Sequence, residues 1–183
     1  NSKPRYYLMD AGYDQKALYE LIRKDYQAQA IIPLNHRGAK EPPEGLDWDA
    51  TPICSAGYRM TYWGGSNGVN KFRCPHVTGQ CDCPFGSSWC SDSNYGMVVK
   101  TRARKDSRLF TVPHRGTTNW HNLYNKRTGV ERCFGRLKKH LGLESGLNVR
   151  GIKKLKTHAY LCVITMIASV VAVNTDKTGK AEA

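Results

Sequence analysis

The sequence predicts an α/β fold in which a β-rich, cysteine-containing segment separates a strand–helix–strand unit from two C-terminal helices. Three observations support this prediction. A strand–helix–strand pattern occupies residues 1–34, short apolar runs among Gly, Pro, Asn, Ser and Cys follow, and helical periodicity returns near Trp120. With 40% hydrophobic and 23% charged residues, the 183-residue chain has an ordinary globular composition, which excludes a disordered protein or a fibre.

The first 34 residues predict a βαβ unit. An aromatic and apolar run at 5–9 ends in Asp10-Ala-Gly, which indicates a strand followed by a turn. Asp14 is expected to cap a helix that ends near Tyr26, and 28–34 is expected to form a second strand. A strand–helix–strand unit of this length forms a parallel pair. Asp10 would then lie at the carboxyl end of a parallel strand, where such sheets place their chemistry.

Residues 35–118 predict an irregular, β-rich insertion with hairpins, in which Tyr58 to Trp63 pack a hairpin. The seven cysteines are an odd number, and no secretory signal is recognisable, so a disulfide framework is disfavoured. Several thiols crowd into this insertion without the usual Cys-x2-Cys pairs, which leaves a structural zinc site and a set of free thiols as alternatives. The zinc ligands chosen are Cys54, Cys74, Cys83 and Cys90. Cys133 and Cys162 are expected to be small core residues.

Helical periodicity predicts two helices in the last third of the chain. An apolar stripe runs from Leu123 to Leu141, and Trp120 is expected in the core. A second helix over 153–173 is apolar nearly all round, which predicts burial between layers, and its apolar run is short for a membrane span. The histidines show no paired spacing and are expected at the surface or as caps: His114, His121, His140 and His158.

The charge of the chain predicts a polyanionic partner. The formal net charge is +13, and the segment from Lys100 to Lys156 carries 16 Lys or Arg against three acids, so it accounts for the whole excess. Charge concentrated in about a third of a chain indicates one binding face, and the simplest partner is nucleic acid. Phosphate contacts are expected at Lys153, Lys154 and Lys156.

One carboxylate lies among cations on the helix that includes Glu131. At about 100° per residue, Tyr124, Arg127, Glu131 and Lys138 share an arc of roughly 60°. Two interpretations are open. Glu131 forms a surface salt bridge with Arg127, or it ligates a divalent ion while Arg127 and Lys138 hold phosphates and Tyr124 contacts a nucleotide. Further DNA contacts are expected on the far side of this helix, at Arg132, Arg136 and Lys139.

The spacing Tyr124-x2-Arg127-x3-Glu131-x6-Lys138 resembles the Tyr-Arg-Glu-Lys signature of bacterial insertion-sequence transposases of the DDE type. The segment 7–14 resembles the region around their second aspartate, and 146–156 resembles their C-terminal end. The resemblance implies a ribonuclease H-like fold with a β-rich insertion before the catalytic helix. It also implies two Mg²⁺ or Mn²⁺ ions, ligated in this chain by Asp10 and Glu131, that serve phosphodiester hydrolysis and strand transfer.

The same resemblance places the first catalytic aspartate upstream of Asp10, where only nine residues precede it. We therefore expect an N-terminally truncated catalytic domain, inactive alone, that acts on insertion-sequence ends and target DNA. A cytoplasmic, nucleoid-associated bacterial protein and a homodimeric active complex follow from the family. The alternative is a non-catalytic DNA-binding module. The expected parts are 1–34 (core), 35–118 (insertion), 119–175 (core helices) and 176–183 (disordered tail).

Overall fold

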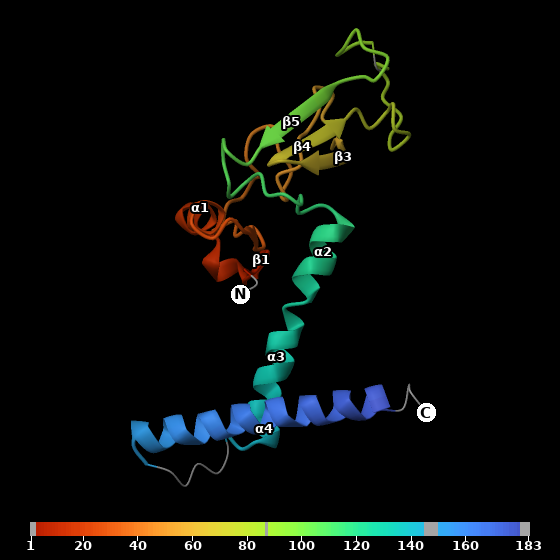
Figure 1. The fold of residues 1–183 in the computed structure, drawn as a ribbon. Coiled ribbons are helices and arrows are strands. Elements are labelled where there is room, and N and C mark those ends of the chain that lie inside the picture. The colour runs from red at the N-terminus through yellow and green to blue at the C-terminus, as the bar shows by residue number, and fades with distance from the viewer. Residues whose placement is uncertain (1–2, 87, 145–149, 180–183) are drawn as a thin grey trace. The chain divides into compact units, whose positions relative to one another are not determined.

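The computed structural model describes residues 3–86, 88–144 and 150–179. The chain divides into two compact units, Asn1–Lys126 and Arg127–Ala183, and each is described by itself below (Figure 1).

The first unit begins with the predicted βαβ arrangement. Strand β1 (Tyr6–Leu8) pairs in parallel with β2 (Gln29–Ile31), and α1 (Lys16–Lys24) connects them after a short 3-10 helix, η1 (Ala11–Tyr13). The parallel pair is thus confirmed. Apolar side chains from the helix and the second strand form its core, because α1 turns one face inward. This core comprises Tyr19, Ile22, Ala28, Ala30 and Ile32.

The hairpins predicted within 35–118 are present as a three-stranded antiparallel sheet. Strand β3 (Thr61–Ser66) pairs with β4 (Val69–Arg73), which pairs with β5 (Val98–Arg102). Asn67 and Gly68 both have positive φ, as the tight turn between β3 and β4 requires.

His114 lies in the core under this sheet, so its prediction as a surface or capping residue is wrong. Its side chain is 2% exposed, stacks on Tyr62 and meets Phe72 edge-on. Nε2 of His114 lies 2.8 Å from Oγ1 of Thr51, which satisfies one ring nitrogen. Burial lowers the pKa of His114 to about 4, so the ring is neutral near pH 7.

The predicted helix after Trp120 is divided between the two units. Helix α2 (Thr118–Asn125) is capped by Thr117, whose Oγ1 accepts a hydrogen bond from the Trp120 amide, and Trp120 is buried as predicted. The second unit contains α3 (Thr128–Gly135), a π-helical turn η2 (Arg136–His140) and α4 (Ile152–Gly179).

Helix α4 is exposed, and the prediction that it lies between core layers is wrong for the described residues. Ile164 is 61% exposed and Val171 57%, and Cys162 is the buried residue among the described side chains of α4. A helix that is apolar all round needs partners on several sides, whereas within this unit α4 contacts the α3–η2 segment. Its part Ile152–Asn174 is long and apolar enough to cross a bilayer, a test that core helices also pass.

Helix α4 reaches Gly179 and so enters the segment expected to be a disordered tail. The last residues of that tail, 180–183, lie outside the described residues, as do 146–149 of the C-terminal resemblance.

Candidate active site and nucleic-acid contacts

Asp10 follows β1, as the sequence predicts. The amide of Met9 still donates to the carbonyl of Ile31, so the parallel ladder ends one residue before Asp10. Asp10 is exposed, and its Oδ1 accepts a hydrogen bond of 2.8 Å from the Gly12 amide at the start of η1. Within the described residues, Asp10 forms no ion pair. Its carboxylate is therefore held in place by the turn and stays open to a ligand.

Gly12 leaves room for the Asp10 carboxylate in this turn. A Cβ at residue 12 would lie 3.0 Å from Oδ1 of Asp10, which is tighter than ordinary van der Waals contact. The Asp-Ala-Gly sequence thus lets the backbone approach the carboxylate closely enough to donate to it.

Asp14 does not cap α1, so that prediction is wrong. Gln15 is the residue that precedes α1, and Asp14 is 1% exposed. Oδ1 of Asp14 accepts from the Tyr19 hydroxyl at 2.8 Å, and Oδ2 accepts from the Asn35 amide at 2.8 Å and from Nε of Arg108 at 2.9 Å. Both oxygens are occupied by protein donors, so Asp14 is unsuited to bind a metal ion.

Arg115 extends this buried network, and sequence reasoning did not identify it. Its Nη2 donates to the Tyr19 hydroxyl at 2.7 Å, and its Nε donates to the carbonyl of Ile32 at 3.0 Å. Burial raises the pKa of Tyr19, so the hydroxyl stays protonated and donates to Asp14. The segment around Arg108 and Arg115 thereby anchors the βαβ unit that presents Asp10. The available signal was two arginines flanking the Pro113-His114 sequence, which points to no partner by itself.

Glu131 lies on α3 of the second unit and pairs with Arg127 at 2.8 Å. This contact is the surface salt bridge of the first interpretation. The side chain of Glu131 is 58% exposed and that of Arg127 is 31% exposed, so the pair is accessible to solvent. An exposed pair of this spacing contributes only about 0.3–0.5 kcal/mol, so a bound cation could replace Arg127 at little cost.

The other two signature residues have protein partners of their own. The ring of Tyr124, in the first unit, stacks on Trp120 with centroids 5.1 Å apart. Nζ of Lys138 lies 3.5 Å from Oε1 of Glu144, and the Lys138 side chain is 50% exposed. The structure thus brings Arg127 and Glu131 together, whereas Asp10 and Tyr124 belong to the first unit.

The remaining predicted DNA contacts are all exposed cations of the second unit. They are Arg132, Arg136, Lys139, Lys153, Lys154 and Lys156. Arg132 and Arg136 also line an apolar cavity of about 370 Å³ between α3 and α4, where Sγ of Cys133 lies 3.6 Å from Sδ of Met166.

The cysteines of the insertion lie in turns at one end of the three-stranded sheet. Cys54 and Cys83 each begin a tight turn that ends in a glycine, and Cys83 also donates its amide to Nδ1 of His76. Partial burial and the nearby thiols of Cys83, Cys54 and Cys74 raise the pKa of Cys81. Across the described residues, no group of three or more His, Cys, Asp or Glu side chains is arranged to hold a metal ion.

Comparison with known proteins gives one match. The family model for the transposase DDE domain matches residues 1–168, which covers most of the chain. Searches of curated proteins and of solved structures gave no match. The family confirms the resemblance to a DDE-type transposase, and it implies a ribonuclease H-like fold and DNA as the partner. This chain belongs to the transposase DDE domain family.

Proposed function

We propose that this chain supplies two metal ligands, Asp10 and Glu131, to the catalytic centre of a DNA transposase that acts on insertion-sequence ends. The observation that carries the proposal is the exposed carboxylate of Asp10, fixed by the Gly12 amide at the end of a parallel strand. Carboxylate oxygens are the ligands that Mg²⁺ and Mn²⁺ prefer. When bound, two such ions activate the attacking hydroxyl or water and stabilise the leaving oxygen.

The chain's own residues orient the DNA in this proposal. Arg127 releases Glu131 and turns to a phosphate oxygen, since a surface pair of this kind is weak. Lys138 exchanges Glu144 for a second phosphate, and Tyr124 contacts a nucleotide. The other exposed cations of the second unit follow the DNA backbone.

A third carboxylate is needed, and Asp14 is occupied by Arg108, Tyr19 and Asn35. We propose that the first aspartate comes from outside these residues and that the chain alone does not turn over. We also propose that the active complex is a homodimer and that the protein is bacterial, cytoplasmic and associated with the nucleoid.

The test is Mn²⁺-dependent nicking of insertion-end DNA by this chain extended at its N-terminus by the rest of a DDE catalytic domain. Asp10→Asn and Glu131→Gln should each abolish nicking while duplex affinity changes less than about twofold, because neither carboxylate attracts phosphates. Glu44→Gln, an exposed acid outside the site, is the control. Nicking that persists in either site variant would refute the assignment.

The alternative is a DNA-binding module without catalysis, which the Arg127–Glu131 pair favours. It predicts that the extended protein binds DNA and shows no metal-dependent nicking under any condition that supports binding.

We also propose that Cys54, Cys74, Cys83 and Cys90 bind a structural Zn²⁺. The support is that the thiols of Cys54, Cys74 and Cys83 lie near one another around Cys81, with Cys54 and Cys83 in turns that end in a glycine.

Metal analysis of the purified chain should give one zinc per chain, lost in Cys83→Ser and retained in Cys133→Ser, whose thiol lies against Met166. If zinc is lost in Cys81→Ser and retained in Cys90→Ser, Cys81 takes the place of Cys90 as the fourth ligand. A protein that carries no zinc and takes up no Co²⁺ would refute the site.

A further inference from the structure

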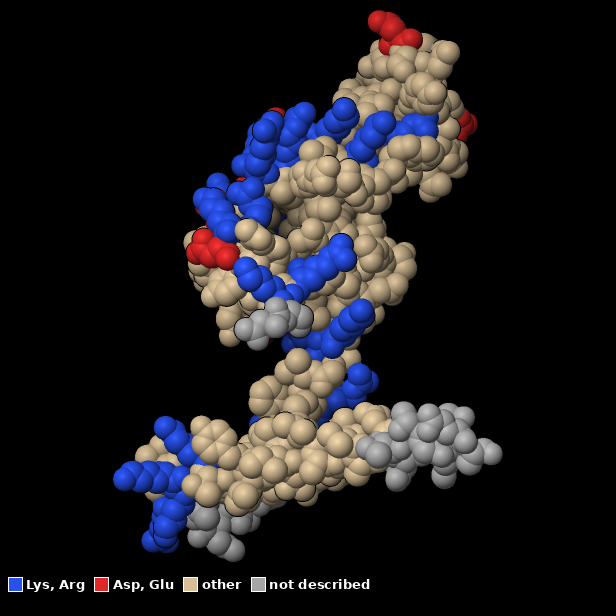
Figure 2. Space-filling view, in the orientation of Figure 1, with Lys and Arg blue, Asp and Glu red and all other residues tan. Residues whose placement is uncertain are grey.

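One face of the three-stranded sheet carries four cations. Asn70 and Phe72 on β4 are buried, so Lys71 and Arg73, which alternate with them, lie on the opposite face. The register places Lys100 opposite Lys71 and Arg102 opposite Val69, on that same outer face. Figure 2 shows Lys and Arg side chains forming a band over this part of the molecule.

Two exposed aromatic rings flank one of these cations. The guanidinium of Arg73 lies 4.2 Å from the centre of the Trp63 ring and 5.0 Å from that of Tyr95. Trp63 is 54% exposed and Tyr95 65%. The register shift between Tyr62 and Gly64 interrupts the alternation of β3, and Trp63 lies against Arg73. Nε of Arg73 is buried and has no hydrogen-bond partner among the described residues. The recorded contacts of this guanidinium are therefore with the faces of the Trp63 and Tyr95 rings.

The charge of this face is not compensated. Strands β3, β4 and β5 contain no Asp or Glu, and within the described residues none of the four cations forms an ion pair. Like charges directly opposite each other, such as Lys71 and Lys100, destabilise an antiparallel pair. A polyanion laid across the sheet would remove that repulsion.

The basic surface continues beyond the sheet. Arg102 and Arg104 line a hollow of about 530 Å³ together with Arg23 and the turn at Asn67 and Gly68. A phosphate chain could therefore pass from the outer face into a basic recess.

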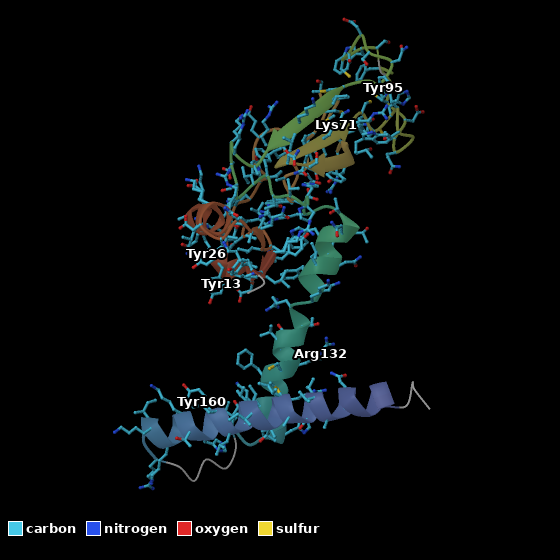
Figure 3. All side chains as sticks on the ribbon, in the orientation of Figure 1. Tyr13, Tyr26, Lys71, Tyr95, Arg132 and Tyr160 are labelled. Atoms are coloured by element: carbon cyan, nitrogen blue, oxygen red, sulfur yellow. The ribbon has the colours of Figure 1, made fainter. Side chains whose placement is uncertain are left out.

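We propose that this face, made of Trp63, Lys71, Arg73, Tyr95, Lys100 and Arg102, binds single-stranded DNA. Unpaired bases stack on exposed aromatic rings, and the backbone follows the row of cations, which is the combination that single strands require. Duplex DNA would engage only the cations, because its bases already stack on one another. The face lies within the first unit and needs no divalent metal, so the inference is independent of the proposed catalytic centre. Figure 3 labels Lys71 and Tyr95 on this part of the chain.

The experiment measures binding of the full chain to a fluorescent oligothymidylate of about 15 nucleotides and to a duplex of equal length, by anisotropy in EDTA. Trp63→Leu should weaken single-strand binding about tenfold or more and leave duplex binding within about twofold. The double variant Lys71→Gln/Lys100→Gln should lower the single-strand salt slope by about 1.4, since each phosphate contact contributes about 0.7.

Matched controls are Trp89→Leu, an exposed ring stacked on Phe85, and Lys16→Gln/Lys40→Gln, two exposed lysines elsewhere. Both should bind like the unmodified chain. Tyr95→Leu gives a second test should Trp63→Leu fail to fold, as judged by circular dichroism.

Equal losses in Trp63→Leu and Trp89→Leu would overturn the proposal. Two results together would also overturn it: the unmodified chain binds the duplex more tightly than the single strand, and only Lys71→Gln/Lys100→Gln weakens duplex binding. The face would then be a duplex contact. Because the assay contains no metal, failure here leaves the nicking test of Asp10 and Glu131 unaffected.

Discussion

Two carboxylate–arginine pairs in this protein have opposite surroundings. Asp14 has a fully buried side chain and pairs with Arg108, whose side chain is 23% exposed. Glu131 is 58% exposed and pairs with Arg127 four residues away. Breaking a buried pair leaves an uncompensated charge and costs about 3–5 kcal/mol, whereas an exposed pair is worth about 0.3–0.5 kcal/mol. The buried carboxylate is thus costly to remove once the fold has formed, and the exposed one can exchange its arginine for a ligand.

The largest expected effect comes from removing the buried carboxylate. Asp14→Ala leaves Arg108 partly buried without its partner and should lower the free energy of unfolding by about 3–5 kcal/mol. Urea denaturation followed by circular dichroism measures it. Glu131→Ala, the matched change in the exposed pair, should cost less than about 0.5 kcal/mol. Equal costs for the two variants would show that burial does not distinguish the pairs.

A second effect of burial should appear as pH dependence. Burial lowers the pKa of His114 from 6.5 to about 4, against the attraction of Asp49 and with help from Arg115 and Arg59. The folded chain therefore binds the proton less well than the unfolded chain, so stability present above pH 6.5 is lost as the pH falls toward 4. The loss should be about 3 kcal/mol.

Urea denaturation at pH 7 and pH 4 tests this, with His114→Gln as the comparison, since glutamine does not titrate and can still meet Thr51. The variant should lose less stability between the two pH values than the unmodified chain. The same pH dependence in both proteins would contradict a titrating His114.

The smallest effect concerns Lys138 on the π-helical turn η2. Lys138→Ala removes one phosphate contact, so the salt slope of duplex binding should fall by about 0.9 while stability hardly changes. Lys24→Ala, in an exposed pair with Glu20 on α1, is the control. An unchanged slope would remove Lys138 from the DNA contacts.

Local patterns predicted much of the first unit and little of the packing. The parallel pair around α1 and the presence of hairpins within 35–118 follow from apolar runs and turn residues that lie next to each other in sequence. The sequence predicted one helix after Trp120, but α2 ends at Asn125 and the first unit ends at Lys126. An apolar stripe shows which side of a helix is buried and does not show where one compact unit ends.

The sequence by itself determined the family, since the model of the transposase DDE domain matches residues 1–168, and it determined that Asp10 follows a parallel strand. Tertiary structure decided that Asp14 pairs with Arg108, that His114 is buried, and that Trp63 and Tyr95 flank Arg73. The physical reason is that periodicity and turn chemistry act between neighbours in sequence. Burial, and with it the strength of an ion pair, is set by residues far along the chain.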